Sequence, residues 1–172
     1  MTAHTAPLSL DVDHANDFYS DAFIRDILAP RPVIAMVGAS MNWNRPSFFA
    51  MKYLQQKGYR VIPVNPGHAG KELLGETVYA RLSDIPEPVQ LVDIFRNSEA
   101  AATVTDEAIA IGAQTIWMQL GVVNIEAARR AEEAGLKVVM NRCPKIEYAR
   151  LSGELGWNGI NSRVISARRR RL

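Results

Sequence analysis

The sequence predicts an α/β protein with a doubly wound, mainly parallel sheet of five or six strands and helices on both faces. Three segments with helical periodicity each end at a glycine, namely Gly58, Gly112 and Gly135, and a short apolar run follows each glycine. Glycine readily takes the left-handed conformation that closes a helix. Short runs rich in Val, Ile or aromatic residues are typical of strands buried on both faces. Helices that alternate with strands imply parallel strands joined by right-handed crossovers.

The individual elements follow in chain order. The expected helices cover residues 20–29, 46–57, 98–111 and 125–134, and the expected strands cover 32–37, 59–64, 89–95, 113–120 and 136–140. Pro30 ends the first helix because proline cannot continue it, whereas Pro46 occupies a first turn, where proline is tolerated. Ser98 and Asn124 are residue types that cap helix N-termini. Between residues 66 and 88 we expect a loop, one short strand near residues 77–80 and a brief helical turn.

A chain of 172 residues fits one domain. We expect a flexible N-terminus over residues 1–16, the domain over 17–165, and a basic tail over 166–172. The single cysteine excludes an internal disulfide and a multi-cysteine metal cluster. No apolar run reaches the roughly 18 residues of a membrane span, and the start lacks the features of a secretory signal. These observations predict a cytoplasmic protein that does not enter membranes.

The charge of the chain is dominated by its end. The formal net charge is +2, but Arg168 to Arg171 contribute four positive charges in a row, so the remainder carries −2. A run of arginines can attract nucleic acid or anionic lipid. Without a basic face, however, such a tail is weak evidence for nucleic-acid binding. We therefore interpret it as a solvated tail.

A ligand crevice in an open parallel sheet lies beyond the carboxyl ends of the strands. The segments at those ends cover residues 37–40, 64–66, 94–98, 119–122 and 141–147. Together they offer backbone amides, small side chains, side-chain amides and arginines, but almost no carboxylate. This composition favours an anionic ligand and does not favour acid–base catalysis.

The first strand–helix turn is the main candidate for phosphate binding. Gly38 and Ala39 permit close approach of the backbone, and the start of the next helix offers free N–H groups and the positive end of its dipole. Ser40 adds a hydroxyl donor and Arg45 a charge-assisted donor. A tight structural turn without a ligand is the alternative interpretation.

The second strand end disfavours ordinary NAD binding. An NAD site carries an acidic residue there for the ribose hydroxyls, whereas this chain has Asn65 and Pro66. The first turn also contains only the first glycine of the G-x-G-x-x-G fingerprint.

Two further strand ends carry candidate ligand contacts. Arg96 can clamp a phosphate and Phe95 can pack on an adenine, although an exposed arginine above a core phenylalanine is an equal alternative. Gln119 follows three apolar residues and precedes Gly121. A polar amide in that position favours a ligand contact over a core role.

Cys143 lies beyond the last strand, between Arg142 and Lys145. Neighbouring cations could lower the pKa of its thiol. The three histidines, His4, His14 and His68, form no nucleophile–base pattern with it. We therefore interpret Cys143 as a structural or redox-sensitive thiol and predict that the chain is not an enzyme.

These motifs resemble those of the stand-alone CoA-binding protein family, over roughly residues 20–165. The matching segments, in order, are VGAS…RPS, GYRVIPVNP, GKELLGETVY, LVDIFRNSEAA, IWMQLGV, VVMNRCPKIE and the GINS segment near the end. The resemblance implies a Rossmann-like domain similar to the CoA-binding domain of the succinyl-CoA synthetase α subunit. It also implies coenzyme A or an acyl-CoA as the ligand.

The resemblance assigns roles to the candidate residues. It implies that the first turn, Gly38 to Ser40 together with Arg45, contacts the phosphates. Asn65 and Pro66 would line the nucleotide, Phe95 and Arg96 the adenine or ribose phosphate, and Gln119 and Gly121 the pantetheine path. The absence of an acidic residue at the second strand fits the 3′-phosphate of CoA, which a carboxylate would repel.

The ligase relatives have parts that this chain lacks. A succinyl-CoA synthetase needs a phosphorylatable histidine on a further domain and an ATP-grasp partner, and no histidine here matches that residue. We therefore expect non-catalytic binding of CoA or an acyl-CoA. Two alternatives stay open, namely a ligase or transferase component that needs a separate ATP-grasp subunit or acyl-CoA enzyme, and a nucleotide-responsive regulator. The sequence also leaves open a monomer or a homodimer.

Overall fold

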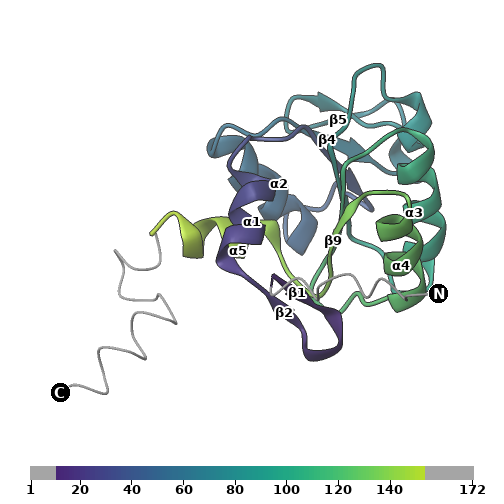
Figure 1. Cartoon of the computed structure of the whole chain (residues 1–172). Helices are drawn as coiled ribbons and strands as arrows, with labels where there is room; N and C mark the ends of the chain where they lie inside the picture. The colour runs from purple at the N-terminus through teal and green to yellow at the C-terminus, as the bar shows by residue number, and fades with distance from the viewer. Residues whose placement is uncertain (1–10, 154–172) are drawn as a thin grey trace, which may run out of the picture.

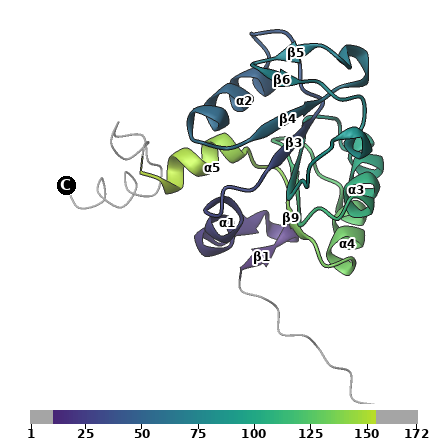
Figure 2. The same ribbon diagram turned by 90° about the horizontal axis from the view of Figure 1, so that it is seen from above.

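The computed structural model describes residues 11–153 and confirms the doubly wound α/β architecture. The central sheet is parallel, with strands in the order β4-β3-β7-β8-β9 (Figures 1 and 2). These strands are β3 (Ile34–Val37), β4 (Val61–Val64), β7 (Leu91–Ile94), β8 (Thr115–Met118) and β9 (Lys137–Val139). Every residue of the strands except Lys137 is buried, as the apolar runs predict.

The strand order places a crevice near the middle of the sheet. Within the central sheet, the chain first forms β3 and then β4 on one side of it. It then crosses to the other side of β3 and forms β7, β8 and β9. A parallel bridge between Val64 and Tyr79 extends the sheet beyond β4. The connection after β3 runs to β4 and the connection after β7 runs the opposite way to β8, so the loops after these two neighbouring strands separate and leave room for a ligand.

Helices cover both faces of the sheet. The helices are α1 (Asp21–Leu28), α2 (Pro46–Gln56), α3 (Ala100–Ala110), α4 (Ile125–Glu133) and α5 (Pro144–Leu151). Helices α3 and α4 cover one face, where the core contains Val92, Ile116 and Val138. Helices α1, α2 and α5 cover the other face, where the core contains Leu91, Trp117 and Val139 (Figure 2). Successive strand residues therefore contribute to two separate apolar layers.

One of the two expected helix caps is confirmed. Asn124 is the N-cap of α4, and its side chain accepts a hydrogen bond from the Ala127 N–H at 2.9 Å. The prediction for Ser98 is wrong, because the N-cap of α3 is Glu99. The Ser98 hydroxyl instead accepts from the Val123 N–H at 3.0 Å, and so it joins the loop after β7 to the loop after β8.

An N-terminal hairpin packs against the body of the domain. It consists of β1 (Val12–Asp13), the short 3₁₀ turn η1 (His14–Asn16) and β2 (Phe18–Tyr19). The sequence interpretation assigned residues 1–16 to one flexible segment, yet His14 Nε2 lies 2.6 Å from Glu132 Oε1 on α4. Residues 12–16 are thus part of the folded unit.

The segment between β4 and β7 contains short elements. They are η2 (Pro66–His68), β5 (Glu72–Leu73), β6 (Glu76–Thr77) and η3 (Leu82–Asp84). The helical turn expected in this segment is η3. The end of the expected domain (154–165), with its GINS segment, and the basic tail (166–172) lie outside the described residues. Within 11–153 no helix is both long and apolar enough to cross a membrane.

Candidate functional site

The predicted site residues line up along the carboxyl edge of the sheet. Backbone hydrogen bonds continue past the strand ends, with the Gly38 N–H donating to the Val64 carbonyl at 2.9 Å and the Phe95 N–H donating to the Val37 carbonyl at 2.8 Å. Gln119 continues the row after β8. The first residues of the loops that follow four strands therefore stand side by side.

Gly38 permits the closest approach within this row. Its φ is +88°, and a Cβ built at this position would lie 2.3 Å from the carbonyl oxygen of Phe95 and 3.0 Å from Cδ of Arg96. Only glycine fits such a position. The missing side chain lets the Arg96 side chain lie across the β3 turn at the middle of the sheet.

The turn after β3 leads directly into α2. Ala39 is buried, and the Ser40 N–H donates to Oγ of Ser47 at 2.9 Å, which fixes the turn against the first residues of the helix. Arg45 is the N-cap of α2, and it forms no side-chain cap. Pro46 has no N–H and the Phe48 N–H donates to the Arg45 carbonyl at 3.1 Å, so the Ser47 N–H and the positive dipole end of α2 are what this turn offers to an anion. Neither Arg45 nor Arg96 has a side-chain partner among residues 11–153.

Asn65 links the first two turns. Its side-chain Nδ2 donates to the Ala39 carbonyl at 2.8 Å, and its Oδ1 accepts from the Gly67 N–H at 2.9 Å. The amide thus holds the backbone of the site, while the exposed Pro66 beside it lines a hollow.

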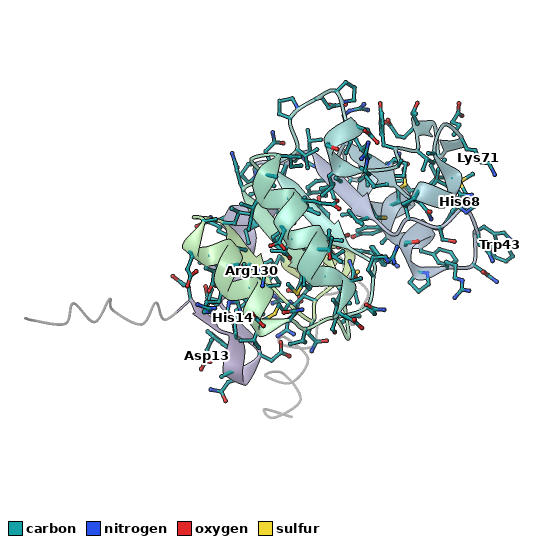
Figure 3. The ribbon with its side chains drawn as sticks, turned by 90° about the vertical axis from the view of Figure 1, so that its right-hand side faces the viewer. Asp13, His14, Trp43, His68, Lys71 and Arg130 are labelled. Atoms are coloured by element: carbon teal, nitrogen blue, oxygen red, sulfur yellow. The ribbon has the colours of Figure 1, made fainter. Side chains whose placement is uncertain are left out.

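Exposed aromatic and basic groups surround these turns. Trp43 projects from the first turn with 70% of its surface exposed. His68 and Lys71 lie at the same end of the molecule (Figure 3). Nδ1 of His68 is shielded from solvent and has no hydrogen-bond partner in the described part of the chain.

Two hollows flank Arg96. The first, which we call the α3 hollow, has a volume of about 310 Å³ and is lined by Pro66, Arg81, Arg96 and Glu107, among others. It lies between the ends of β3 and β4 and the first turns of α3. Arg81 and Arg96 offer two cations to an anionic group there, while Glu107 and several apolar side chains form much of the remaining wall.

The second hollow, the α5 hollow, has a volume of about 490 Å³. Its walls are mainly apolar, and they include Phe49, Leu120 and Ile146, which are 48%, 57% and 44% exposed. Arg96 and Lys145 are its cationic residues. A large apolar surface of this kind, open to solvent, is typical of a binding groove.

A buried polar pair lies beneath the α5 hollow. Asp93, in β7, is completely buried, and Nε2 of Gln119 donates to its Oδ1 at 2.8 Å. Burial raises the pKa of Asp93 to about 7, although the Gln119 hydrogen bond opposes this shift. Sequence reasoning missed Asp93, but an acidic residue within the otherwise apolar segment 91–95 was the available signal.

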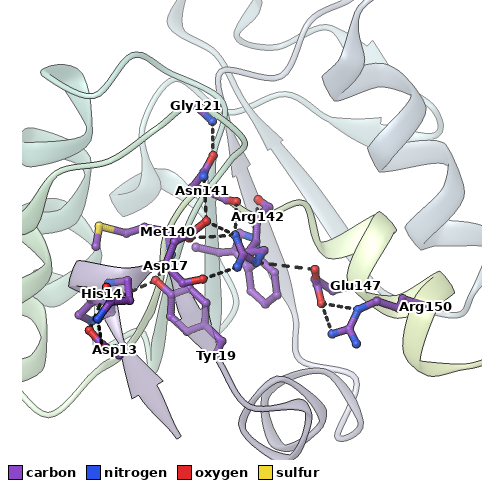
Figure 4. Close-up of polar contacts among 12 residues, drawn as sticks. Asp13, His14, Asp17, Tyr19, Gly121, Met140, Asn141, Arg142, Glu147 and Arg150 are labelled. Carbon is purple, nitrogen blue, oxygen red and sulfur yellow. Dashed lines mark hydrogen bonds and ion pairs between the residues drawn. The ribbon is translucent and has the colours of Figure 1, made fainter. Parts of the chain in front are cut away.

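The turn after β8 is held by residues that the sequence did not point to (Figure 4). The Gly121 N–H donates at 2.8 Å to Oδ1 of Asn141, which has a positive φ of 56°. Arg142 binds the carboxylate of Asp17 at 2.8 Å, and Tyr19 Oη accepts from the Met140 N–H at 2.8 Å. The N-terminal hairpin therefore braces the loop that positions Gly121.

The surroundings of Cys143 differ from the expectation of a lowered pKa. The Arg142 guanidinium turns to Asp17, and burial, followed by the nearby charge of Asp93, raises the pKa of the Cys143 thiol. Glu147, at the end of the same segment, is buried and pairs with Arg150 at 2.5 Å, so it is not a solvated residue. Within residues 11–153, no group of three His, Cys, Asp or Glu side chains could hold a metal ion.

Cys143 is expected to react slowly with thiol reagents, because the reactive thiolate is disfavoured in its buried position. At pH 7.5, Ellman's reagent should modify the native chain at least about tenfold more slowly than the urea-unfolded chain. The single cysteine makes the measurement direct. Equal rates in the two states would contradict the raised pKa.

Comparisons with known proteins agree with this geometry. The family model of the CoA binding domain matches residues 32–149. The uncharacterized protein YneT of Bacillus subtilis is 38% identical over 130 residues, which cover 76% of this chain and 95% of YneT. The segment that contains the row of strand ends is therefore shared with these proteins.

Solved structures show the same fold. A hypothetical protein from Pyrococcus horikoshii has a TM-score of 0.76 and 41% identity, over 80% of this chain and 95% of its own. The dinucleotide-forming acetyl-coenzyme A synthetase 1 of Ca. Korarchaeum cryptofilum has a TM-score of 0.56 and 26% identity. That alignment covers 64% of this chain but only 26% of the synthetase, so the similarity concerns one part of a larger enzyme.

Proposed function

Because this chain belongs to the family of CoA-binding domains, we propose that it binds coenzyme A or an acyl-CoA and does not itself catalyse a reaction. The observation that carries the proposal is the position of Arg96, whose guanidinium has no partner within residues 11–153 and lines both the α3 hollow, with its second arginine, and the mainly apolar α5 hollow. Coenzyme A has the same division, since phosphates join a polar nucleotide to a long arm that ends in a thiol.

The phosphates are the anchor of the proposed complex. In this arrangement the diphosphate lies at the N-terminus of α2, where Ser40, Arg45 and Arg96 would supply the donors. The nucleotide, with its 3′-phosphate, occupies the α3 hollow beside Pro66 and Arg81. Backbone N–H groups and guanidinium groups are the usual partners of phosphate oxygens.

The pantetheine arm fits the α5 hollow. Phe49, Leu120 and Ile146 would bury their exposed surface against the arm or an attached acyl group. Burial of apolar surface stabilises binding by about 25 cal/mol per Å² before the costs of association. The arm would thus add affinity to the electrostatic attraction of the phosphates.

The absence of catalysis is a part of the proposal that rests on the chemistry of the titratable groups near the hollows. The Cys143 thiol has a raised pKa, which makes it a poor nucleophile. Asp93 is sealed from solvent and cannot reach a ligand. A general acid or base must come within hydrogen-bond reach of the reacting atoms.

Titration calorimetry with CoA is the direct test. Arg96→Ala should weaken CoA binding about tenfold, because a charge-assisted hydrogen bond to phosphate is lost. Higher salt should weaken binding to the wild type more than binding to the variant. Arg129→Ala removes an equivalent charge on α4 that pairs with Glu133, and it should leave affinity unchanged.

The outcomes separate binding from folding. The melting temperature of Arg96→Ala should stay close to that of the wild type, since its side chain forms no bond within the described chain. No heat with CoA at tens of micromolar wild-type protein would contradict the proposal. A fall in melting temperature as large as that of a core substitution would show that Arg96 supports the fold.

One observation favours a second candidate function. The similarity to a part of an acetyl-coenzyme A synthetase is compatible with a ligase component that acts with a separate ATP-grasp subunit. Purification of the chain from its host with such a subunit, followed by ATP-dependent thioester formation by the pair, would support this candidate. An unchanged thioester pool after mixing the two would exclude it.

A further inference from the structure

Asp93 is a carboxyl group in the middle of a buried parallel strand. Its neighbours in register are Met36 on β3 and Trp117 on β8, and none of its surface is exposed. Burial of a carboxyl group among apolar residues is costly unless hydrogen bonds compensate it. The strand does not need an acidic side chain at this position, so Asp93 is expected to serve another part of the structure.

The partner of Asp93 defines that role. Asp93 Oδ1 accepts a hydrogen bond of 2.8 Å from Gln119 Nε2, while Asp93 Oδ2 has no partner among residues 11–153. Whether Asp93 is ionised or carries its proton on the unpartnered Oδ2, its Oδ1 accepts, so this contact requires the NH₂ end of the amide to face inward. The carboxylate therefore determines which way the Gln119 amide is turned.

The other end of the amide is available to a ligand. Among residues 11–153 no N–H donor reaches Gln119 Oε1, although the amide also interacts with the Cys143 thiol, whose S–H is a weak donor. Gln119 lines the α5 hollow beside Cys143. The carbonyl oxygen thus supplies a hydrogen-bond acceptor to a hollow with mainly apolar walls.

We infer that Asp93 is a positioning residue, which turns the Gln119 amide so that the site prefers a ligand arm carrying an amide N–H. The inference rests on the proposed function. The pantetheine arm of CoA contains two amide N–H groups, whereas nucleotides without that arm offer none in this hollow. An acceptor that has only a weak thiol donor beside it, in a hollow with mainly apolar walls, penalises such ligands.

A double-mutant cycle tests the inference. Asp93→Leu should weaken CoA binding about fivefold, because Gln119 loses its anchor. The same substitution should have no effect in a Gln119→Leu background, since the amide is then absent. Asp93→Asn should stay within about twofold of the wild type, because an asparagine carbonyl can still accept from Nε2.

Two controls make the readout specific. Adenosine 3′,5′-bisphosphate shares the nucleotide end of CoA but has no arm, so its affinity should be equal in all variants. Thr105→Val removes another buried polar atom without a partner, on α3, and it should leave CoA affinity unchanged. The inference is overturned if Asp93→Leu weakens both ligands equally, or if its effect persists without Gln119.

A measurement without ligand separates the inference from the proposed function. The side-chain NH₂ protons of Gln119 should exchange slowly with water in the wild type, and rapidly in Asp93→Leu, as followed by NMR. Rapid exchange in the wild type overturns the positioning role even if CoA binds. Absence of CoA binding with slow exchange overturns the proposed function and leaves the anchor of Gln119 established.

Discussion

Replacement of Gly38 by alanine is expected to lower the free energy of unfolding by about 3 kcal/mol or more. The residue has a φ of +88°, and an added Cβ would lie 2.3 Å from the Phe95 carbonyl oxygen. The neighbouring backbone has little room to yield, because the Phe95 N–H is bonded to the Val37 carbonyl at 2.8 Å. Both the left-handed conformation and the steric overlap therefore act against the folded state.

Urea unfolding of Gly38→Ala and Gly112→Ala would separate the two contributions. Gly112 has a similar φ of +77°, but a Cβ there would meet no atom within 4 Å. Its replacement should cost only about 1 kcal/mol, the conformational penalty alone. Losses of equal size at the two positions would contradict the close approach of Phe95 to Gly38.

The second large effect is a pH dependence of stability that originates at Asp93. Burial raises the pKa of this carboxyl group from 3.8 to about 7 in the folded protein. Between pH 4 and pH 7 the folded chain therefore holds a proton that the unfolded chain has released. Asp93 stabilises the fold most fully below pH 4, and this contribution is lost as pH rises through 7.

Unfolding of the wild type and of Asp93→Asn at several pH values would reveal this contribution. The stability of the wild type relative to the variant should fall by about 1.4 kcal/mol per pH unit between pH 4 and pH 7. The difference should be constant from pH 7 to pH 8, before the nearby Cys143 thiol titrates. Parallel curves for the two proteins would show that Asp93 has an ordinary pKa in the folded state.

The sheet and four of its helices could be predicted because each has a strong local pattern. The glycines after 46–57, 98–111 and 125–134 identified the helix ends, and apolar runs identified the strands. The N-terminal hairpin has strands of two residues, which are too short to show alternation. Its position depends instead on contacts with residues more than 100 positions away, such as that between His14 and Glu132.

The edge of the candidate site could be predicted, whereas the roles of individual side chains at that edge could not. Parallel strands end at one edge, so Gly38, Phe95 and Gln119 had to stand together. Tertiary hydrogen bonds determine which polar atoms remain available to a ligand. Both ends of the Asn65 amide, for example, are engaged by such bonds. Asp93 was missed because a strand pattern was interpreted only for its apolar residues.

The hairpin also constrains the order in which the molecule can be assembled. Tyr19 accepts a hydrogen bond from a residue 121 positions later, and Asp17 binds an arginine 125 positions later. During synthesis, the hairpin therefore has no partners for these contacts until nearly the whole domain has emerged from the ribosome. Contacts of such sequence separation slow folding, because a long loop must close before they form. Docking of the hairpin is thus a late step, and it completes the loop that holds Gly121.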